Sequence, residues 1–332
     1  MRALVTGGAG FIGSHLVDHL LALGARVTVL DDLSTGSEAN LDQVKGHSQL
    51  RFVTGSILDE RLVDRLTAET DTVFHLAAAV GVHTIVDHPL RSLRTNLHGT
   101  ENVLEAARRA GARVLVASTS EVYGKNDADG LDEEADRILG SPLKSRWSYA
   151  AAKGLDELMA YVYGQQYGLE AAIVRLFNVV GPRQTGRYGM VVPRFVDQAL
   201  RGEPLTIYGD GTQRRCFGSV YDVVPAMVAL LDRKSAHGRA VNLGGFQETS
   251  IRALAERVRE LTGSASEIVY VPYEEAYGEG YEDMQRRMPD TGLAKRLIGY
   301  APSYSLDEII TSIVAARGGP RLVDQAAAPL TV

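Results

Sequence analysis

The sequence predicts an α/β protein with a doubly wound parallel sheet and a smaller C-terminal lobe. Two observations favour this fold class. In the first half, short β-branched runs alternate with longer segments of helical periodicity, which is typical of βαβ units. Near residue 178 the pattern changes to shorter segments separated by Gly/Pro-rich connections. We therefore expect a first domain over 1–177, a smaller lobe over 178–317 that is partly interleaved with it, and a flexible tail over 318–332.

The expected elements follow from these two periodicities. Runs rich in Val, Leu and Ala predict buried parallel strands, and apolar residues at every third or fourth position predict helices that cover them. The strands of the first domain are predicted at Ala3–Thr6, Arg26–Leu30, Thr72–Leu76, Arg113–Ala117 and Ala171–Leu176. Its helices are predicted at Phe11–Leu23, Pro89–Ala110 and Tyr149–Tyr167, with further helices around 190–201, 223–232 and 250–262.

Composition excludes several classes of protein. The 332 residues carry a formal net charge of −6, so no basic surface for nucleic acid is expected. Cys216 is the single cysteine, which excludes an internal disulfide and a cysteine-based zinc cluster. No apolar run is long enough to span a membrane, and the histidines lack partners at metal-ligand spacing. We expect a cytoplasmic enzyme with no metal.

A glycine-rich turn joins the first strand to the first helix in the sequence TGGAGFIG, residues 6–13. Gly7 would permit the tight turn, Gly10 would let the backbone approach a pyrophosphate, and Gly13 would let the helix pack closely on the strand. The helix N-terminus would add N–H donors and the positive end of its dipole. Asp31 ends the second strand, where a carboxylate accepts hydrogen bonds from ribose hydroxyls and repels a 2′-phosphate. The turn therefore predicts a Rossmann-type site for NAD rather than NADP.

A second group of polar residues belongs to the predicted sheet edge and the helix that follows. Tyr149 and Lys153 are four residues apart, so they share a helix face, and an ammonium beside the phenol would favour the phenolate. The strand at 113–117 runs into the hydroxyl-rich segment Ser118–Gly124. Open α/β sheets bind ligands at the carboxyl ends of their strands. We therefore expect Tyr149 to act as a general base beside this segment.

These motifs together resemble the extended short-chain dehydrogenase/reductase family, in its nucleotide-sugar branch. The resemblance covers nearly the whole chain. It rests on the segments TGGAGFIGSHL (6–16), DDLSTG (31–36), HLAA (75–78), NLHGTENVLEAA (96–107), STSEVYG (118–124), YAAAK (149–153), RLFNVVGPRQ (175–184) and GDGTQRRCF (209–217).

The resemblance implies a role for each matching residue. Thr119, Tyr149 and Lys153 would form the catalytic triad, and Asn178 and Arg215 would hold the diphosphate of a nucleotide sugar. Further cofactor contacts are implied for Phe11, Ile12, Asp32, Ser34, Gly36, Ser56, Ile57, Leu76, Ala77, Ala78 and Asn96, besides Tyr149 and Lys153. Substrate contacts are implied for Ser120 and Val192. Ser56 departs from the pattern, because many members carry an aspartate there.

Three features distinguish the reactions of this branch, all of which begin by oxidising the sugar at C4. Glu121 follows Thr119, where dehydratases and decarboxylases use an acid. The segments Arg146–Tyr149 and Tyr277–Asp290 are similar to those of UDP-glucuronate decarboxylases and UDP-apiose/xylose synthases, in which the arginine matching Arg287 reaches the active site. Arg287 would bind the sugar carboxylate bidentately. Glu121 would orient water or relay a proton.

The resemblance thus implies an NAD-dependent UDP-glucuronate decarboxylase that gives UDP-xylose or its 4-keto precursor. The alternative is a 4-epimerase of UDP-glucuronate or another UDP-sugar. A 4,6-dehydratase is less favoured, because it would leave Arg287 without a task. A non-catalytic NAD sensor is less favoured because it would need none of Thr119, Tyr149 and Lys153.

The resemblance also implies a homodimer in which two long helices of each subunit form a four-helix interface. The matching segments are 89–110 and 149–168. The second of these has an apolar stripe beyond what facing the sheet requires. Its members are Leu155, Leu158, Met159 and Val162.

Overall fold

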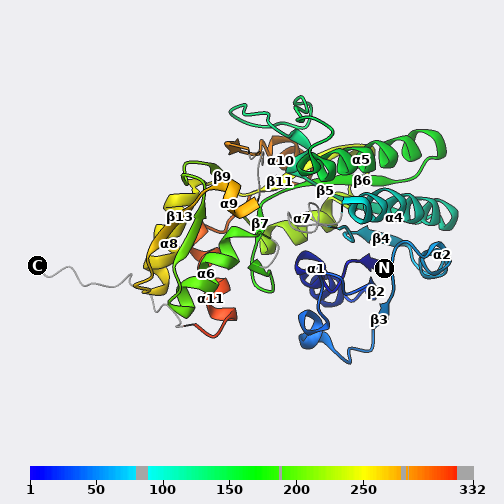
Figure 1. The fold of residues 1–332 in the computed structure, drawn as a ribbon. Coiled ribbons are helices and arrows are strands. Elements are labelled where there is room, and N and C mark those ends of the chain that lie inside the picture. The colour runs from blue at the N-terminus through cyan, green and yellow to red at the C-terminus, as the bar shows by residue number, and fades with distance from the viewer. Residues whose placement is uncertain (80–88, 187–188, 278–281, 283, 320–332) are drawn as a thin grey trace, which may run out of the picture.

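The computed structural model describes residues 1–79, 89–186, 189–277, 282 and 284–319 and shows two lobes (Figure 1). The larger lobe holds a seven-stranded sheet in which every neighbouring pair is parallel, in the order β11-β6-β5-β4-β1-β2-β3. This confirms the doubly wound fold class. The strands are β1 Arg2–Thr6, β2 Arg26–Asp31, β3 Leu50–Thr54, β4 Thr72–His75, β5 Arg113–Thr119, β6 Ala171–Phe177 and β11 Ala240–Gly244.

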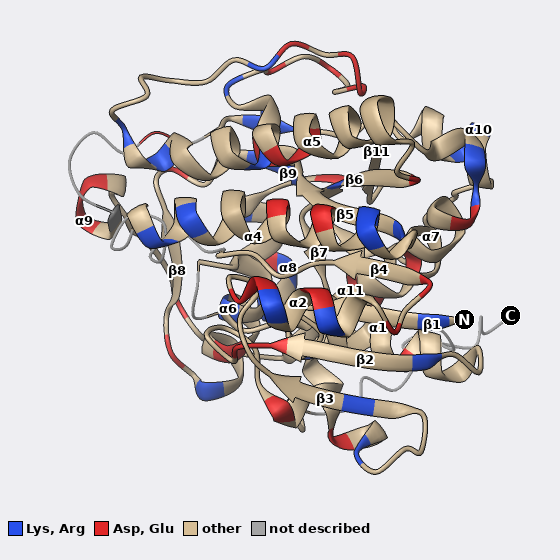
Figure 2. Ribbon diagram, turned by 90° about the vertical axis from the view of Figure 1, so that its right-hand side faces the viewer, with Lys and Arg blue, Asp and Glu red and all other residues tan. Residues whose placement is uncertain are grey.

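Helices cover both faces of this sheet (Figures 1 and 2). One core lies between the sheet and two helices, α1 (Phe11–Ala22) and α7 (Val220–Asp232). The other lies under α2 (Glu60–Thr67), α4 (Pro89–Ala110) and α5 (Ser148–Tyr167). The strands are buried on both sides, which explains their nearly continuous apolar sequences.

The smaller lobe has its own apolar core, to which α6, α8 and α11 contribute. Its helices are α6 Val191–Arg201, α8 Ile251–Thr262, α9 Tyr273–Tyr277 and α11 Leu306–Ala316, whereas α10 Gly292–Ile298 packs against α7 and β11 of the larger lobe. Its short strands are β7 Val179–Val180, β8 Leu205–Tyr208, β9 Arg214–Cys216, β10 Gly218–Ser219, β12 Glu248–Ser250, β13 Ile268–Val271 and β14 Arg286–Arg287.

The chain crosses between the lobes more than once. After the predicted boundary at residue 177, α7 and β11 return to the large sheet, where β11 pairs with β6. The domain boundary at residue 177 therefore stays a prediction. It does not apply to α7 and β11, which follow that residue but belong to the large sheet and its helices. Most of the predicted tail, 320–332, lies outside the described residues.

The sheet topology determines where a ligand would bind. The strand order reverses between β1 and β4, and the connections at their carboxyl ends run to opposite faces of the sheet. Ligands of open α/β sheets bind at such a point. The segments that follow β1, β4 and β5 meet there, opposite the smaller lobe.

Candidate active site

A cavity of about 800 Å³ lies along the carboxyl ends of the strands and is lined by residues of both lobes. Most of the predicted site residues line it. From the larger lobe these are Gly7, Gly10, Phe11, Ile12, Gly13, Asp31, Asp32, Ser34, Ile57, Leu76, Ala77, Ala78, Thr119, Ser120, Glu121 and Tyr149. From later in the chain they are Asn178, Val192, Arg215 and Arg287. The topology thus brings residues from 7 to 287 to one cavity.

The glycine-rich turn has the geometry of a phosphate cradle. Gly7 has a φ of +73°, and a Cβ there would lie 2.8 Å from the Ala77 nitrogen. A Cβ on Gly13 would collide with the Gly7 carbonyl oxygen, so the helix can start this close to the strand only with glycine. The first residue of α1, Phe11, follows Gly10, which offers no side-chain cap. The N-terminus of α1 therefore faces the cavity with donors for an anion.

Asp31 ends β2 with both carboxylate oxygens engaged by the backbone. Oδ2 accepts a hydrogen bond from the Ala9 amide and Oδ1 accepts one from the Leu33 amide, each at 2.9 Å. Burial raises the pKa of Asp31, and the two amides oppose that shift. Asp31 therefore holds the glycine-rich turn against β2 as well as lining the cavity.

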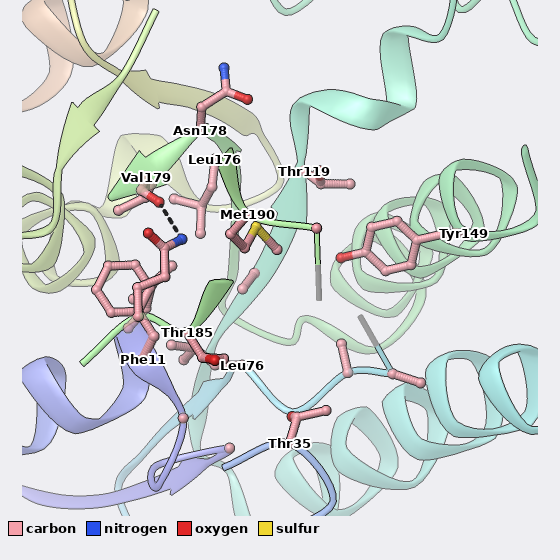
Figure 3. A pocket seen from close by; sticks show the side chains of 18 of the residues that line it. Phe11, Thr35, Leu76, Thr119, Tyr149, Leu176, Asn178, Val179, Thr185 and Met190 are labelled. Carbon is pink, nitrogen blue, oxygen red and sulfur yellow. Dashed lines mark hydrogen bonds between the residues drawn. The ribbon is translucent and has the colours of Figure 1, made fainter. Parts of the chain in front are cut away.

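Tyr149 opens the first turn of α5 and points its hydroxyl into the cavity that Thr119 and Asn178 also line (Figure 3). The Thr119 hydroxyl oxygen accepts a hydrogen bond from the Glu121 amide at 3.2 Å, which leaves its proton free to be donated. Burial raises the pKa of Tyr149, and the nearby Glu121 and Asp156 carboxylates raise it further. This differs from the expectation that Lys153 makes the phenol more acidic.

Lys153 is itself paired with a carboxylate. Its side chain is buried and its Nζ donates to Asp156 Oδ2 at 2.7 Å. Lys153 does not line the cavity. The Asp156 carboxylate offsets the positive charge of Lys153, whereas the sequence prediction assumed that this charge acts on the Tyr149 phenol alone.

Glu121 lies between two arginines. Its Oε2 accepts from Arg146 Nη1 at 2.5 Å, and its Oε1 accepts from Arg287 Nη1 at 2.6 Å. Burial opposes ionisation of Glu121, but the two guanidinium charges and their hydrogen bonds outweigh it and hold its pKa far below the usual range. The cluster of two guanidinium groups and one carboxylate has one positive charge in excess at the edge of the cavity.

Arg287 reaches this cluster from the other lobe. Strand β14 pairs with β9 in parallel, which places Arg287 beside Arg215. Arg287 Nη2 donates to Asn178 Oδ1 at 2.9 Å, and Asn178 Nδ2 donates to the Cys216 carbonyl at 3.0 Å. The structure therefore joins two of the predicted substrate residues, Asn178 and Arg287, in one hydrogen-bond network, and places Arg215 on the neighbouring strand. Part of the predicted segment 277–290, namely 278–281 and 283, lies outside the described residues.

Four predicted cofactor residues do not line the cavity: Gly36, Ser56, Asn96 and Lys153. Asn96 instead accepts from the Ala79 amide at 2.9 Å and so shapes the segment after β4. The Ser56 hydroxyl oxygen accepts from the Leu58 amide. Gly36 packs against the Ala9 backbone, where a Cβ would lie 2.9 Å from the Ala9 carbonyl carbon. These residues support the walls of the cavity.

The sequence prediction missed several polar residues of the cavity. Arg146 was noted only as part of a segment, although it precedes Tyr149 by one helical turn and faces Glu121. In the smaller lobe, the Arg194 guanidinium lies 4.0 Å from the centre of the Tyr208 ring. Gln213 donates to the Tyr273 hydroxyl beside them. A stacked aromatic–guanidinium pair and an amide suit a flat, polar heteroaromatic ring.

The part of the chain that the structure describes offers neither a metal site nor a membrane-spanning helix. Within 1–79, 89–186, 189–277, 282 and 284–319, no group of three or more His, Cys, Asp and Glu could hold a metal ion. No helix in the same part of the chain is long and apolar enough to cross a membrane.

Known proteins similar to this chain agree on the family. The model of the NAD dependent epimerase/dehydratase family matches residues 3–244. A UDP-N-acetyl-alpha-D-glucosaminuronate decarboxylase of Bacillus cytotoxicus is 42% identical over 92% of this chain and 94% of its own length. UDP-glucuronic acid decarboxylase 1 of Xenopus tropicalis is 40% identical over 92% of this chain and 70% of its own length.

Solved structures with the same fold include enzymes that are named for other reactions. The dTDP-glucose 4,6-dehydratase DesIV of Streptomyces venezuelae, with NAD and TYD bound, superposes with a TM-score of 0.87 at 33% identity, covering 96% of this chain and 97% of that one. A UDP-glucose 4-epimerase of Thermotoga maritima, with UDP-glucose, has a TM-score of 0.86 at 34% identity and covers 96% and 99%. The fold is thus shared by different activities, and the reaction has to be argued from the site.

Proposed function

Since this chain belongs to the NAD dependent epimerase/dehydratase family, we propose that it is an NAD-dependent decarboxylase of a UDP-uronate, with UDP-glucuronate as the expected substrate. The relatives named above support the proposal, because two similar proteins are decarboxylases of UDP-sugars with a C6 carboxylate.

The observation that carries the proposal is the Arg146–Glu121–Arg287 cluster. Its excess positive charge lies in the cavity that the Tyr149 hydroxyl also faces. An anionic group on the sugar would neutralise that charge, whereas a neutral hexose would leave it uncompensated. Guanidinium groups match carboxylates in planar, bidentate geometry. The cluster therefore suits a uronate better than a neutral sugar.

Tyr149 and Thr119 are the groups for the first step. The Thr119 hydroxyl would donate to the O4 atom of the sugar, and the Tyr149 oxygen would take the C4 hydroxyl proton. When bound, NAD accepts a hydride from C4 and returns it later. Because Tyr149 is buried, its proton transfer proceeds with little competition from bulk water.

Decarboxylation then follows from the position of the new ketone, which is β to the C6 carboxylate. The C5–C6 bond breaks, CO2 leaves, and the electron pair moves onto the C4 oxygen as an enolate. A proton from water is taken up at C5, and the C4 ketone is finally reduced or released. The arginines would orient the carboxylate before the bond breaks. Glu121 would fix both guanidinium groups, since a carboxyl held ionised this strongly is a poor proton donor.

The residues present fit NAD as the cofactor. The Gly7–Gly13 cradle leaves room for a diphosphate at the start of α1, and the Asp31 carboxylate lies where a ribose 2′-hydroxyl would donate. At the other end of the cavity, Arg194, Tyr208 and Gln213 would hold the nucleobase of the sugar nucleotide. Asn178 and Arg215 line the same cavity and would contact the diphosphate.

We expect Asp31→Ala to weaken NAD binding by about tenfold to a hundredfold, because one charge-assisted hydrogen bond contributes about 1.5–3 kcal/mol. Discrimination against NADP should relax in the same variant, since the carboxylate that repels the 2′-phosphate is gone. Calorimetric titration of the wild type and the variant with both cofactors measures this. Wild-type protein that binds NADP as tightly as NAD would contradict the role of Asp31.

The reaction itself is tested by incubating the protein and NAD with UDP-glucuronate and, separately, with UDP-N-acetylglucosaminuronate, followed by mass spectrometry. A product lighter by CO2 supports decarboxylation. Turnover of the acetamido sugar alone would keep the reaction and correct the substrate at C2. A product of unchanged mass and new retention time would replace the proposal with the 4-epimerase.

We also propose a homodimer formed by α4 and α5, which pack side by side (Figure 2). Leu155, Leu158 and Tyr161 are about half exposed on α5, and Leu90 is exposed at the start of α4. Of the predicted stripe, Met159 packs against the core instead. The second half of α5, residues 158–167, has no charged residue. Such a face is typical of a surface that another helix covers.

Leu158→Glu should therefore convert the dimer to a monomer, because it would place two charges in the apolar interface. Sedimentation velocity at micromolar concentration measures the change. Leu23→Glu is the matched control, since Leu23 is similarly exposed but lies at the end of α1. A monomeric wild-type protein with full activity would contradict the proposed dimer.

A further inference from the structure

Three side chains of α5 share one face of the helix. Tyr149, Lys153 and Asp156 are spaced i, i+4 and i+7, so they follow one another from the cavity into the core. The Lys153 side chain is 2% exposed and that of Asp156 is 0% exposed, and the pair is joined at 2.7 Å. Water therefore screens neither charge, and each acts strongly on its neighbours.

Polar residues of other elements continue this line. Burial raises the pKa of Asp156, and the Lys153 ammonium and the Thr100 hydroxyl on α4 oppose that shift. The Thr100 hydroxyl lies 3.0 Å from His75 Nε2. His75 Nδ1 lies 2.8 Å from the Thr6 hydroxyl at the end of β1. Burial, reinforced by the Lys153 charge, lowers the pKa of His75 to about 3, so the imidazole is neutral. Asp156 thus supplies the negative charge that faces Lys153 along this line.

Among the residues that the structure describes, two other carboxylates near Tyr149 are held by arginines. On its cavity side, Glu121 is held by Arg146 and Arg287. On its own helix, Glu157 is turned away toward Arg175, with which it forms a buried ion pair at 2.8 Å. The negative charge of Asp156 therefore acts on both Lys153 and Tyr149 from the core.

We propose that Asp156 is a positioning residue that fixes the Lys153 ammonium and opposes its pull on the Tyr149 proton. The inference rests on the proposed function, because it concerns Tyr149 as the base of the C4 oxidation. That base has two tasks in one turnover, since it takes the C4 hydroxyl proton and must return it when the ketone is reduced. A phenol made strongly acidic by an uncompensated lysine would take the proton readily but return it slowly. Asp156 balances the two steps.

The test is the pH dependence of kcat/KM for CO2 release in Asp156→Asn. The amide can still accept a hydrogen bond from Lys153 but no longer opposes the phenolate. The acidic limb, where Tyr149 must lose its proton, should move to lower pH by about one unit. Asp156→Glu restores the charge and should bring the limb back toward the wild-type position. An unshifted limb, or a shift to higher pH, would overturn the proposal.

Glu157→Gln is the matched control. This substitution also replaces a buried, ion-paired carboxylate of α5 by an amide. The Glu157 side chain, however, faces Arg175 instead of Lys153. If Asp156 were only structural, both variants would lose thermal stability and neither would shift the limb. Should Asp156→Asn fail to fold, Asp156→Ser is measured instead, since its smaller side chain introduces no clash and predicts the same shift.

A second measurement is independent of turnover. The ultraviolet absorption of tyrosinate is titrated in substrate-free protein, and the contribution of Tyr149 is isolated by subtracting the titration of Tyr149→Phe. Asp156→Asn should shift that contribution to lower pH. If no UDP-uronate is decarboxylated while this shift occurs, the proposed function fails and the role of Asp156 stands. If turnover occurs and neither the titration nor the limb moves, the role of Asp156 fails alone.

Discussion

Tyr149→Phe should lower the turnover of the UDP-uronate by a factor on the order of 10²–10⁴, the usual contribution of a general base. The phenylalanine ring keeps the packing of this buried side chain but cannot take the C4 hydroxyl proton. Both NADH formation and CO2 release should fall together, because every later step depends on the ketone. Steady-state rates of both signals measure the loss, and calorimetry with UDP-uronate should show binding nearly as tight as in the wild type.

Tyr163→Phe is the control for this variant. Tyr163 lies on the same helix α5 but is outside the cavity and packs beside Tyr167. Its loss of a hydroxyl should leave turnover within about twofold, as for most substitutions away from a site. Near-normal activity of Tyr149→Phe would remove the shared oxidation mechanism from consideration.

Arg287→Ala should separate decarboxylation from the oxidation that precedes it. The variant removes one of the two guanidinium groups around Glu121, and with it the excess positive charge of the cluster. The loss of a charge-assisted, bidentate contact corresponds to about 1.5–3 kcal/mol, or roughly tenfold to over a hundredfold in CO2 release. NADH should accumulate, because Tyr149 and Thr119 remain in place to oxidise C4. Single-turnover measurements of NADH absorbance and of CO2 record the two steps separately.

Arg286→Ala is the matched control, since the neighbouring arginine on β14 points away to Glu248 and Asp129. It should release CO2 at nearly the wild-type rate. Equal losses of NADH formation and CO2 release in Arg287→Ala would show that Arg287 supports the cavity as a whole and does not act on the carboxylate.

The large sheet and the cofactor turn were predictable because their signals are local. Buried parallel strands read as continuous apolar runs, and the spacing of Gly7, Gly10 and Gly13 states the backbone geometry directly. The edge strand β3 and the short helix α2 were missed because their local signals are weak. The strand at Leu50–Thr54 is only partly buried, and Glu60–Thr67 is a short segment in which half of the residues are charged. Neither has the apolar pattern by which the central elements are recognised.

The pairing of the charged residues in the site could not be predicted from the sequence. Glu121 and Arg287 are 166 residues apart, and Glu121 and Arg146 are 25 apart, so no local spacing connects them. The helical spacing of Lys153 and Asp156 was readable, but an acid three residues from a lysine usually lies in water. Only the fold shows that both are buried and that Asp156, rather than the Tyr149 phenol, receives the lysine's hydrogen bond.

The pairing of β14 with β9 has a consequence for the order in which the protein becomes active as it is synthesised. A growing chain that has passed residue 244 has all seven strands of the large sheet, together with Thr119, Tyr149 and Lys153. It still lacks Arg287, which enters only when β14 docks on a strand formed some seventy residues earlier. Contacts between distant parts of a chain close late, since the entropy of ordering the intervening segment must first be overcome. A nascent chain can therefore assemble the cofactor turn and the base before it acquires the second arginine of the Glu121 cluster.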